Sequence, residues 1–504
     1  RWYRVDMAMD LTAGQIQGAI TSQESHSPAR DLLEPVDGST FSHAGMLNYL
    51  GSLDSCLFAA SANGEHFDGR IARPHLTIDD TEIVWDLGRE IDGRGIVDVS
   101  GNSRHGLLHQ LPARGVTGPG WDGTCESWTV NPSHYDAVHF HTDDLYDVAW
   151  QTTAVLDLPK ELPSGIYAFR LRSEQGEDRV PFFVRPAEGF GTAKIALLMS
   201  SCTYIAYANH RMLFEGADFV GARSRLSPEH EYIRQHPELG ASLYEKHADG
   251  SGVMYSSRNR PILQLRPGAD RWNFTPDTDI NAYLDHLHIG HDIVADEDVH
   301  FEGLDALAPY RVIVTGTHPE YWSTSMLNAL KDWQRQGGRL IYLGGNGFYW
   351  RVAFNKTWPG AIELRRAEDG VRNWQTEPGE SYHSFNGEYG GLWRRLGRAP
   401  NELVGIGFAA QGFKKATHYQ RSEASWDSRA AWIFEGVQED LIGTSGLGGG
   451  AAGQEIDRYD TTLGSPQHAV VLASATEFGP DMIRTKEEFE AAVNAPCPDP
   501  LVRA

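Results

Sequence analysis

The amino-acid sequence predicts a multidomain protein in which two β domains precede a larger, doubly wound α/β domain. Three observations predict this fold. Residues 1–125 alternate apolar and polar side chains between turns rich in Gly and Asp, and residues 126–190 repeat that texture in a shorter set. From residue 191, short apolar runs alternate with segments of helical spacing. The length of 504 residues leaves room for about three domains of about 150 residues each.

Residues 1–125 are expected to form a β-sandwich. The stretches "RWYRVDMAMDL" and "TEIVWDL" alternate like half-buried strands, between turn residues such as those of "DVSGNSRHG". Residues 126–190 are expected to form an immunoglobulin-like domain, with strands in "TTAVLDLP", "SGIYAFRLRS" and "DRVPFFVRP". The Pro- and Gly-rich stretch "RPAEGFGTA" then predicts a linker.

Residues 191–504 are expected to form the α/β domain. Strands are predicted in "KIALLMSS", "HDIVADEDV", "YRVIVTG" and "RLIYLGG". Helices are predicted in "TYIAYANHRMLF", "INAYLDHLHIG" and "TSMLNALKDWQRQGG", the last closed by glycine. Ligands bind beyond the carboxyl ends of the strands in open α/β sheets. The segments "SSCTYIAYAN", "TGTHPEYW" and "GGNGFYW" therefore mark the expected site.

The segment "TGTHPEYW" places a histidine and an acid directly after a buried strand. Pro319 cannot donate to a strand ladder, so the strand must end near Gly316, with His318 and Glu320 just beyond it. Asn346 lies among three glycines, which allow a backbone to approach a ligand closely. That segment lacks the pattern of a phosphate-binding loop.

Aromatic and acidic residues elsewhere are further candidates. Tyr204 and Tyr207 share a helix face, and at least one of them is expected to pack in the core. Tyr244 lies in a stretch rich in His, Asp and Gly, and alone it would be an ordinary surface tyrosine. The Gly-dense stretch "SGLGGGAAGQEIDRYD" is either a flexible loop or a wall that brings an acid such as Glu455 into the site.

Composition narrows the class of protein. The net charge of −24, from 44 Lys and Arg against 68 Asp and Glu, argues against binding to nucleic acid or to anionic membranes. The sequence has no apolar run of about 18 residues and no signal peptide, so the cytoplasm is the default expectation. The four cysteines form no CxxC pair, which argues against a cysteine zinc site and suits a reducing compartment (Cys56, Cys125, Cys202 and Cys497).

Two other mechanisms are considered from the residues. An amidase with Cys202 as its nucleophile, near His318 and Glu320, would need a Gly-flanked turn at the cysteine, which "SSCTY" lacks. Zinc hydrolysis is not supported by an HExxH motif. The pairs "HLHIGH" and "HFH" lie in ordinary helix and strand contexts, where histidines are more often solvated or packed than ligands.

Nine segments, spread along nearly the whole chain, resemble segments that occur in the same order in a known protein family. They are "IVDVSGNSRHG", "GPGWDG", "DRVPFFVRP", "TYIAYAN", "GSGVMYSSRNRPILQLRP", "TGTHPEYW", "GGNGFYW", "SFNGEYGG" and "GAAGQEIDRYD". The chain resembles the family of N,N-dimethylformamidase large (beta) subunits. The resemblance implies a lectin-like β-sandwich, an immunoglobulin-like domain, and an amidotransferase-like α/β domain that has lost the cysteine nucleophile.

The resemblance also implies a cofactor, a mononuclear Fe(III) ion bound by two tyrosinates and one glutamate. Carried over by position, these metal ligands are Tyr207, Tyr244 and Glu320. His318, Asn346 and Glu455 match the positions beside the metal and the substrate, and are the expected catalytic residues. Phenolate and carboxylate oxygens suit a hard cation, whereas softer metals prefer thiolate or imidazole.

The implied reaction is iron-dependent hydrolysis of N,N-dimethylformamide to formate and dimethylamine. The alternatives are the same iron chemistry on another small amide or formamide, and a lectin-like binding protein without catalysis. The family's small (alpha) subunit is the implied partner, in a dimer of heterodimers. The resemblance further implies that the chain starts inside the lectin-like domain and stops at "PCPDPLVRA", short of further strands and a closing helix.

Overall fold

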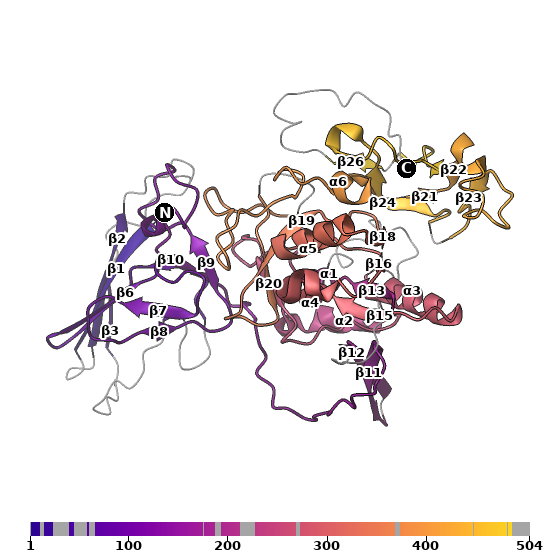
Figure 1. Cartoon of the computed structure of the whole chain (residues 1–504). Coiled ribbons are helices and arrows are strands. Elements are labelled where there is room, and N and C mark those ends of the chain that lie inside the picture. Colours follow the sequence, from indigo (N-terminus) through magenta and orange to yellow (C-terminus); the bar gives the residue numbers. More distant parts are fainter. Residues whose placement is uncertain are drawn as a thin grey trace. The chain divides into compact units, whose positions relative to one another are not determined.

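The computed structural model divides the chain into two compact units, each described here by itself (Figure 1). Unit 1 contains Arg1–Asp144, His247–Gly250 and Thr376–Tyr389, and unit 2 contains Leu145–Lys246, Ser251–Gln375 and Gly390–Ala504. The structure describes residues 2–10, 15–23, 40–44, 58–59, 66–174, 176–186, 193–211, 227–268, 273–367, 373–446, 448–480 and 482–485. The boundaries expected near residues 125 and 190 stay predictions.

Unit 1 consists of antiparallel sheets, as its alternating sequence predicts. One sheet joins β1 (Trp2–Asp10), β2 (Gln15–Gln23) and β3 (Thr40–Ala44). A second has the order β4 (Gly69–Ala72), β10 (Ala137–Phe140) and β9 (Ala113–Val116). A third joins β5 (His75–Ile78), β6 (Thr81–Asp86), β7 (Gly95–Asp98) and β8 (Gly106–Leu107). In β6, Ile83 and Trp85 are buried and Glu82 is exposed, as its period of two requires.

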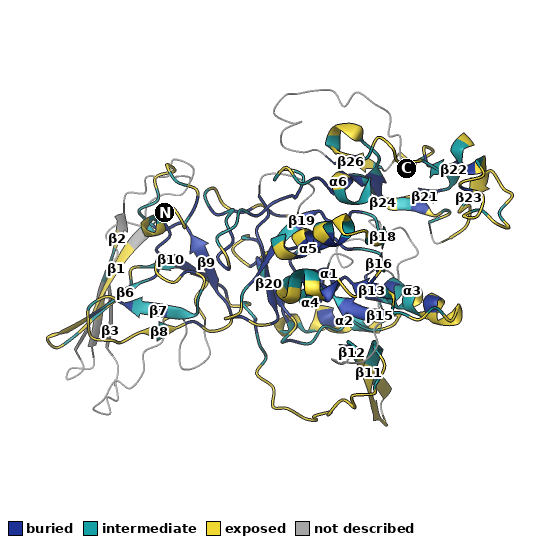
Figure 2. Ribbon diagram, in the orientation of Figure 1, coloured by how far each residue is buried: buried dark blue, intermediate teal, exposed yellow. Residues whose placement is uncertain are grey.

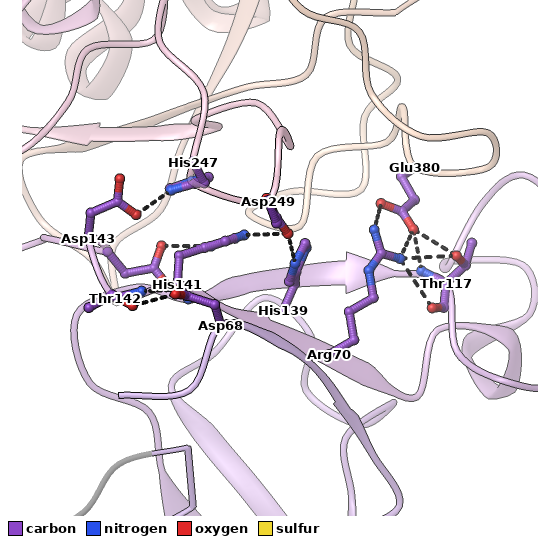
Figure 3. A network of polar contacts seen from close by, with 11 residues as sticks. Asp68, Arg70, Thr117, His139, His141, Thr142, Asp143, His247, Asp249 and Glu380 are labelled. Atoms are coloured by element: carbon purple, nitrogen blue, oxygen red, sulfur yellow. Dashed lines mark hydrogen bonds and ion pairs between the residues drawn. The ribbon is translucent and has the colours of Figure 1, made fainter. Parts of the chain in front are cut away.

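A buried ion pair ties a distant segment of the chain to the second of these sheets (Figure 3). Arg70 of β4 contacts both carboxylate oxygens of Glu380, with Nη2 3.1 Å from Oε2. The backbone N–H and the hydroxyl of Thr117 donate to Glu380 at 2.8 and 2.7 Å. Burial alone would raise the pKa of Glu380, but Arg70 and Thr117 outweigh it and lower the pKa from 4.5 to about 2.

Unit 2 is built on a four-stranded parallel sheet, which confirms the α/β texture expected from residue 191 onward. Its strand order is β15 (Asp292–Ala295), β13 (Ile195–Met199), β16 (Val312–Thr315) and β18 (Arg339–Ile341). The main connecting helices are α1 (Ser201–Ala206), α3 (Phe274–His286), α4 (Asp296–Glu302) and α5 (Thr324–Arg335). Strands β13 and β15 are largely buried, whereas α4 and α5 each present one exposed face (Figure 2).

Helix α5 shows how local sequence sets these elements. The hydroxyl of Ser323 accepts a hydrogen bond from the N–H of Met326 at 3.3 Å and caps the helix start. Met326, Leu330 and Trp333 follow one face and are buried. Gly337, with a φ of 95°, ends the helix, as the sequence predicts.

The remaining elements of unit 2 are shorter. Its other sheets have the orders β14-β20-β19-β17, β24-β21-β26, β23-β22-β25 and β11-β12. The bounds are β11 (Gly165–Ser173), β12 (Gly176–Val184), β14 (Tyr255–Ser257), β17 (Tyr321–Trp322), β19 (Trp350–Phe354), β20 (Ala361–Leu364), β21 (Gly407–Thr417), β22 (Tyr419–Arg421), β23 (Leu441–Ile442), β24 (Ala452–Arg458), β25 (Ala473–Ser474) and β26 (Ile483–Arg484), with helices α2 (Pro228–Gln235) and α6 (Pro400–Val404). None of the helices in the described part of the chain is long and apolar enough to cross a membrane.

Two expectations about elements were wrong. The stretch "TTAVLDLP" forms no strand, and residues 151–160 are all exposed, with Val155 81% accessible. An alternating pattern gives a strand only where a partner strand and a covering surface exist, and the described residues supply neither here. Helix α1 ends at Ala206, earlier than "TYIAYANHRMLF" suggests, and residues 212–214 of that stretch lie outside the described residues.

Replacing Glu380 by Gln should destabilise unit 1 and change its response to acid. The charged form of Glu380 adds stability above pH 4.5, and this contribution is lost as the pH falls toward 2. Glu380→Gln should therefore lower the free energy of unfolding by about 3 kcal/mol near pH 7, with a smaller difference from the unmodified chain at pH 2–3. Denaturant unfolding at several pH values measures both effects.

The matched control is Glu126→Gln, since Glu126 is exposed. It should leave stability within about 0.5 kcal/mol. A Glu380→Gln chain as stable as this control at pH 7 would show that the buried pair adds nothing.

Candidate functional site

The candidate site lies beyond the carboxyl ends of two neighbouring parallel strands, β13 and β16. The chain passes from β13 to its neighbour β15 and then returns to the other neighbour, β16. Ligands bind at such a reversal of strand order in open α/β sheets. Leu198 of β13 pairs with Thr315 of β16, so the two strands end side by side. Tyr207 follows β13 through α1, and Glu320 follows β16 by five residues.

Gly316 turns the chain beyond β16 in a confined space. A Cβ atom there would lie 2.3 Å from Oδ2 of Asp277 and 2.8 Å from Oγ of Ser200, so any side chain would clash. The N–H and hydroxyl of Thr317 donate to Asp277 at 2.5 and 2.8 Å. These contacts fix the path of the chain toward His318 and Glu320.

Tyr207, Tyr244 and Glu320 converge. The two phenolic oxygens are 2.6 Å apart, and the Tyr207 oxygen lies 3.0 Å from Oε2 of Glu320. The Tyr244 oxygen lies 3.2 Å from both carboxylate oxygens. Tyr207 is 8% exposed and Glu320 2%. The structure thus brings together the three residues expected as metal ligands, which come from three separate segments.

Backbone contacts hold these three residues in place. The N–H of Glu320 bonds the hydroxyl of Thr203 at 3.3 Å, and its carbonyl accepts from the N–H groups of Tyr349 and Trp350 at 2.9 and 3.0 Å. The N–H of Leu243 donates to the carbonyl of Ala206 at 2.9 Å, which brings the Tyr244 segment beside the end of α1. The site is therefore positioned by main-chain bonds and does not depend on side-chain rotamers alone.

Burial makes the two phenols weak acids in the absence of a bound metal ion. It raises the pKa of Tyr207 and of Tyr244 well above their ordinary value, and the Glu320 carboxylate raises both further. Two phenolates and a carboxylate at these separations would repel one another. A bound cation would reverse this balance, because it favours the ionised form of every oxygen that it contacts.

The three residues fit the implied cofactor. Phenolate and carboxylate are hard, anionic donors that suit Fe(III). Mutual distances of 2.6–3.2 Å are those of oxygens that share one small cation. Tyr207, Tyr244 and Glu320 would hold the ion.

His318, Glu455 and Asn346 form a chain of contacts that begins at Glu320. Nε2 of His318 lies 2.9 Å from Oε2 of Glu320 and 3.3 Å from Oε2 of Glu455. The amide of Asn346 donates to Oε1 of Glu455 at 3.1 Å. Glu455 comes from β24, so the Gly-dense stretch does bring an acid to this place. The structure therefore groups all six residues expected from the sequence.

Burial and neighbouring charges shift the pKa values of His318 and Glu455 in this group. Burial alone would lower the pKa of His318, but Glu455 and Glu320 raise it to about 9. Burial raises the pKa of Glu455 to about 7, although His318 opposes that shift. In the absence of a bound metal ion, the two carboxylates thus favour the protonated form of His318, and Glu455 can exchange a proton near neutral pH.

Comparison with known protein families identifies the family of this chain. Residues 113–494 match the family model described as "N,N-dimethylformamidase beta subunit-like, C-terminal". The chain belongs to this family. This confirms the resemblance carried by the sequence motifs.

Two curated relatives of the family are each named N,N-dimethylformamidase beta subunit. The protein from Paracoccus aminophilus is 37% identical over 463 residues, and the one from Alcaligenes sp is 36% identical over 459 residues. Each alignment covers 88% of this chain and 60% of the relative. The family member described here therefore spans about 60% of the length of the curated relatives that it matches.

Tyr321 and Arg366 are residues of this family member's site that the sequence reasoning missed. The hydroxyl of Tyr321 donates to the Tyr244 oxygen at 2.5 Å. The guanidinium of Arg366 is fully buried, lies 4.6 Å from the centre of the Tyr244 ring and donates to the Tyr321 oxygen at 3.3 Å. Tyr321 directly follows Glu320 in "HPEYW", which was a usable signal, whereas nothing in the local sequence singles out Arg366.

Asp457 is a further acid at this place. It accepts hydrogen bonds from the N–H of Asn346 and the hydroxyl of Tyr342, both at 2.8 Å. Asn346 has a φ of 54°, a left-handed conformation that asparagine tolerates. The glycines beside it serve contacts within the chain, since a Cβ on Gly345 would lie 2.9 Å from the carbonyl oxygen of Glu455.

Tyr204 and Cys202 lie outside the oxygen cluster. Tyr204 donates to the buried Asp277 and packs edge-on against Phe274, so it is the core tyrosine of its pair. Cys202 is completely buried, and burial together with nearby Asp296 raises its pKa well above the ordinary value. Its thiol is therefore held in the protonated, unreactive form. Cys56 and Cys497 lie outside the described residues.

Proposed function

We propose that this chain carries the catalytic centre of an iron-dependent hydrolase that converts N,N-dimethylformamide and water into formate and dimethylamine. The observation that carries the proposal is the convergence of the oxygens of Tyr207, Tyr244 and Glu320 within 3.2 Å. The substrate follows from the name of the two curated relatives.

When bound by these three residues, an Fe(III) ion supplies a Lewis acid that polarises the amide carbonyl and acidifies water. Arg366 supports the ionised phenols, because its buried positive charge lies over the Tyr244 ring. Tyr321 donates to the Tyr244 oxygen and so sets the direction of its remaining lone pairs.

His318 stabilises negative charge that develops on the carbonyl oxygen during attack. Its protonated ring lies against Glu320 and so points a preorganised N–H into the cluster. The carbonyl of His318 accepts from the hydroxyl of Thr203 at 2.7 Å, which fixes the residue at its backbone.

Glu455 and Asn346 handle the water and the proton. Oδ1 of Asn346 is buried and has no hydrogen-bond partner among the described residues, so it is a free acceptor for an O–H of the attacking water. Oε1 of Glu455 is held by the Asn346 amide. Glu455 carries the proton to the nitrogen of the departing dimethylamine, which must be protonated to leave.

The wider assignments are part of the same proposal. The parallel sheet of unit 2 is the amidotransferase-like domain, the sheets of unit 1 belong to the lectin-like domain, and the β11-β12 pair belongs to the immunoglobulin-like module. The partner is a small alpha subunit, because the relatives are named as beta subunits. Two such heterodimers pair in the assembled enzyme.

Cys202→Ala should keep most of the hydrolase activity. The thiol is buried and protonated, and no step above uses it. Amine release from N,N-dimethylformamide and iron content should both stay close to those of the unmodified enzyme. Loss of turnover with full iron content would instead point to cysteine nucleophile chemistry.

Glu320→Gln and Glu455→Gln should have different defects. Glu320→Gln removes one of three ligand charges, so iron content and activity should fall together. Glu455→Gln should retain iron and lose turnover rate by about 10²–10⁴-fold, because proton transfer to the amine is impaired. Elemental analysis and an amine-release assay on both variants measure the difference.

Glu402→Gln serves as the control for both, since its carboxylate contacts Lys331 away from the cluster, at 3.2 Å. Its iron content and its rate of amine release should equal those of the unmodified enzyme. Iron loss from Glu455→Gln, or a fully metallated Glu320→Gln enzyme, would mean that Glu455 is the iron ligand and Glu320 is not.

A panel of small amides and formamides in the same amine-release assay shows whether N,N-dimethylformamide or another small amide is the preferred substrate.

A further inference from the structure

A second group of chemically active side chains lies in unit 1 (Figure 3). His139 belongs to β10 and His141 follows directly after that strand, so the two side chains share one face. His247 and Asp249 reach the same place from the short segment His247–Gly250. The three histidines are at most 8% exposed. None of them takes part in the proposed reaction.

The ligand-bearing atoms of this group converge. Nε2 of His139 lies 2.7 Å and Nε2 of His141 3.9 Å from Oδ2 of Asp249. One ligand atom from each of these three residues lies within 4.8 Å of the others. The side chain of Asp249 is 32% exposed, so the group is reachable from solvent on that side.

Two further carboxylates orient the rings from behind. Oδ1 of Asp144 lies 3.1 Å from Nδ1 of His141, which leaves the opposite nitrogen of that ring toward Asp249. Oδ1 of Asp143 lies 2.6 Å from Nδ1 of His247, whose ring stacks on His141 at a centroid distance of 3.6 Å. A carboxylate on the far nitrogen of an imidazole fixes its tautomer and is the usual support of a metal-ligating histidine.

We propose that His139, His141 and Asp249 bind a divalent cation of the zinc class, with Asp144 holding His141 in position. Two imidazole nitrogens and one carboxylate oxygen are a donor set that suits Zn²⁺. This site is separate from the oxygen cluster of unit 2 in both residues and donor type.

Electrostatics favour a cation over a network of hydrogen bonds alone. Asp143, Asp144 and Asp249 bring three negative charges to rings that stack too closely for all of them to be protonated, since like charges at such distances repel. Arg70, the nearby guanidinium in Figure 3, is already paired with Glu380. A divalent cation would offset the negative charge of these carboxylates.

The cation would have a structural role. Asp249 is 110 residues from His139 in sequence, so one ion would join the segment His247–Gly250 to the end of β10. A ligand that binds only the folded chain stabilises it, and joining distant segments is how metal sites support folds. The motif "HFH" contains His139 and His141, and its sequence context alone argued against a pair of metal ligands. The third proposed ligand, Asp249, lies beside them only in the folded chain.

The test measures zinc in the purified full chain and its binding after chelator treatment. Elemental analysis of the purified chain should find about one zinc per chain. After the chelator has removed this zinc, calorimetric titration should show that the chain binds about one Zn²⁺ again. His139→Ala and His141→Ala should each lose that zinc while iron content stays unchanged. Asp144→Asn should weaken Zn²⁺ binding by about 10–100-fold. Zinc should also raise the thermal unfolding temperature of the chelator-treated chain but not that of His141→Ala.

His109→Ala is the matched control, since His109 is an exposed histidine of the same unit. It should bind Zn²⁺ like the unmodified chain. Glu320→Gln gives the reciprocal control, because it should lose iron and keep zinc. The proposal is overturned if the chelator-treated chain takes up no Zn²⁺, or if His139→Ala and His141→Ala bind as much as His109→Ala. Circular dichroism spectra of the histidine variants that match the spectrum of the unmodified chain show that loss of zinc does not come from misfolding.

Discussion

The oxygens of Tyr207, Tyr244 and Glu320 lie within 3.2 Å of one another in a buried place, and the rest of the site depends on this crowding. Burial and the Glu320 carboxylate raise the pKa of both phenols, so they stay protonated in the absence of a bound metal ion. In the proposed function, the same crowding favours a small, hard, highly charged cation, because such a cation stabilises the ionised form of every oxygen that it contacts. Arg366 and His318 flank the cluster with positive charge, and so limit the repulsion without entering it.

The parallel sheet explains why these residues meet. Strands β13 and β16 end together at the point where the strand order reverses, and Tyr207 and Glu320 follow them within one short helix and one turn. Gly316 leaves room for Asp277, which anchors the turn toward His318. Strand β24 adds Glu455 from a different sheet, and His318 links Glu455 to Glu320.

Apolar runs and glycine positions predicted the parallel strands and helix α5, because a buried strand and an amphipathic helix each need only local periodicity. They failed at "TTAVLDLP", where alternation exists without a partner. Tyr204 and Tyr207 could not be told apart by spacing, since only the fold puts one beside Asp277 and the other beside Glu320. Tyr244 came from the family resemblance alone, and Arg366 and the cluster around His139 depend on contacts between segments far apart in sequence.

The central claim is that two tyrosines of this cluster bind iron as tyrosinates. Resonance Raman spectroscopy of the iron-loaded enzyme, excited in its visible absorption band, tests it most directly. The account predicts enhanced tyrosinate ring vibrations that weaken in Tyr207→Phe and in Tyr244→Phe and are unchanged in Tyr204→Phe. An active, iron-loaded enzyme whose spectrum lacks tyrosinate vibrations, or one that loses them in Tyr204→Phe, would contradict it.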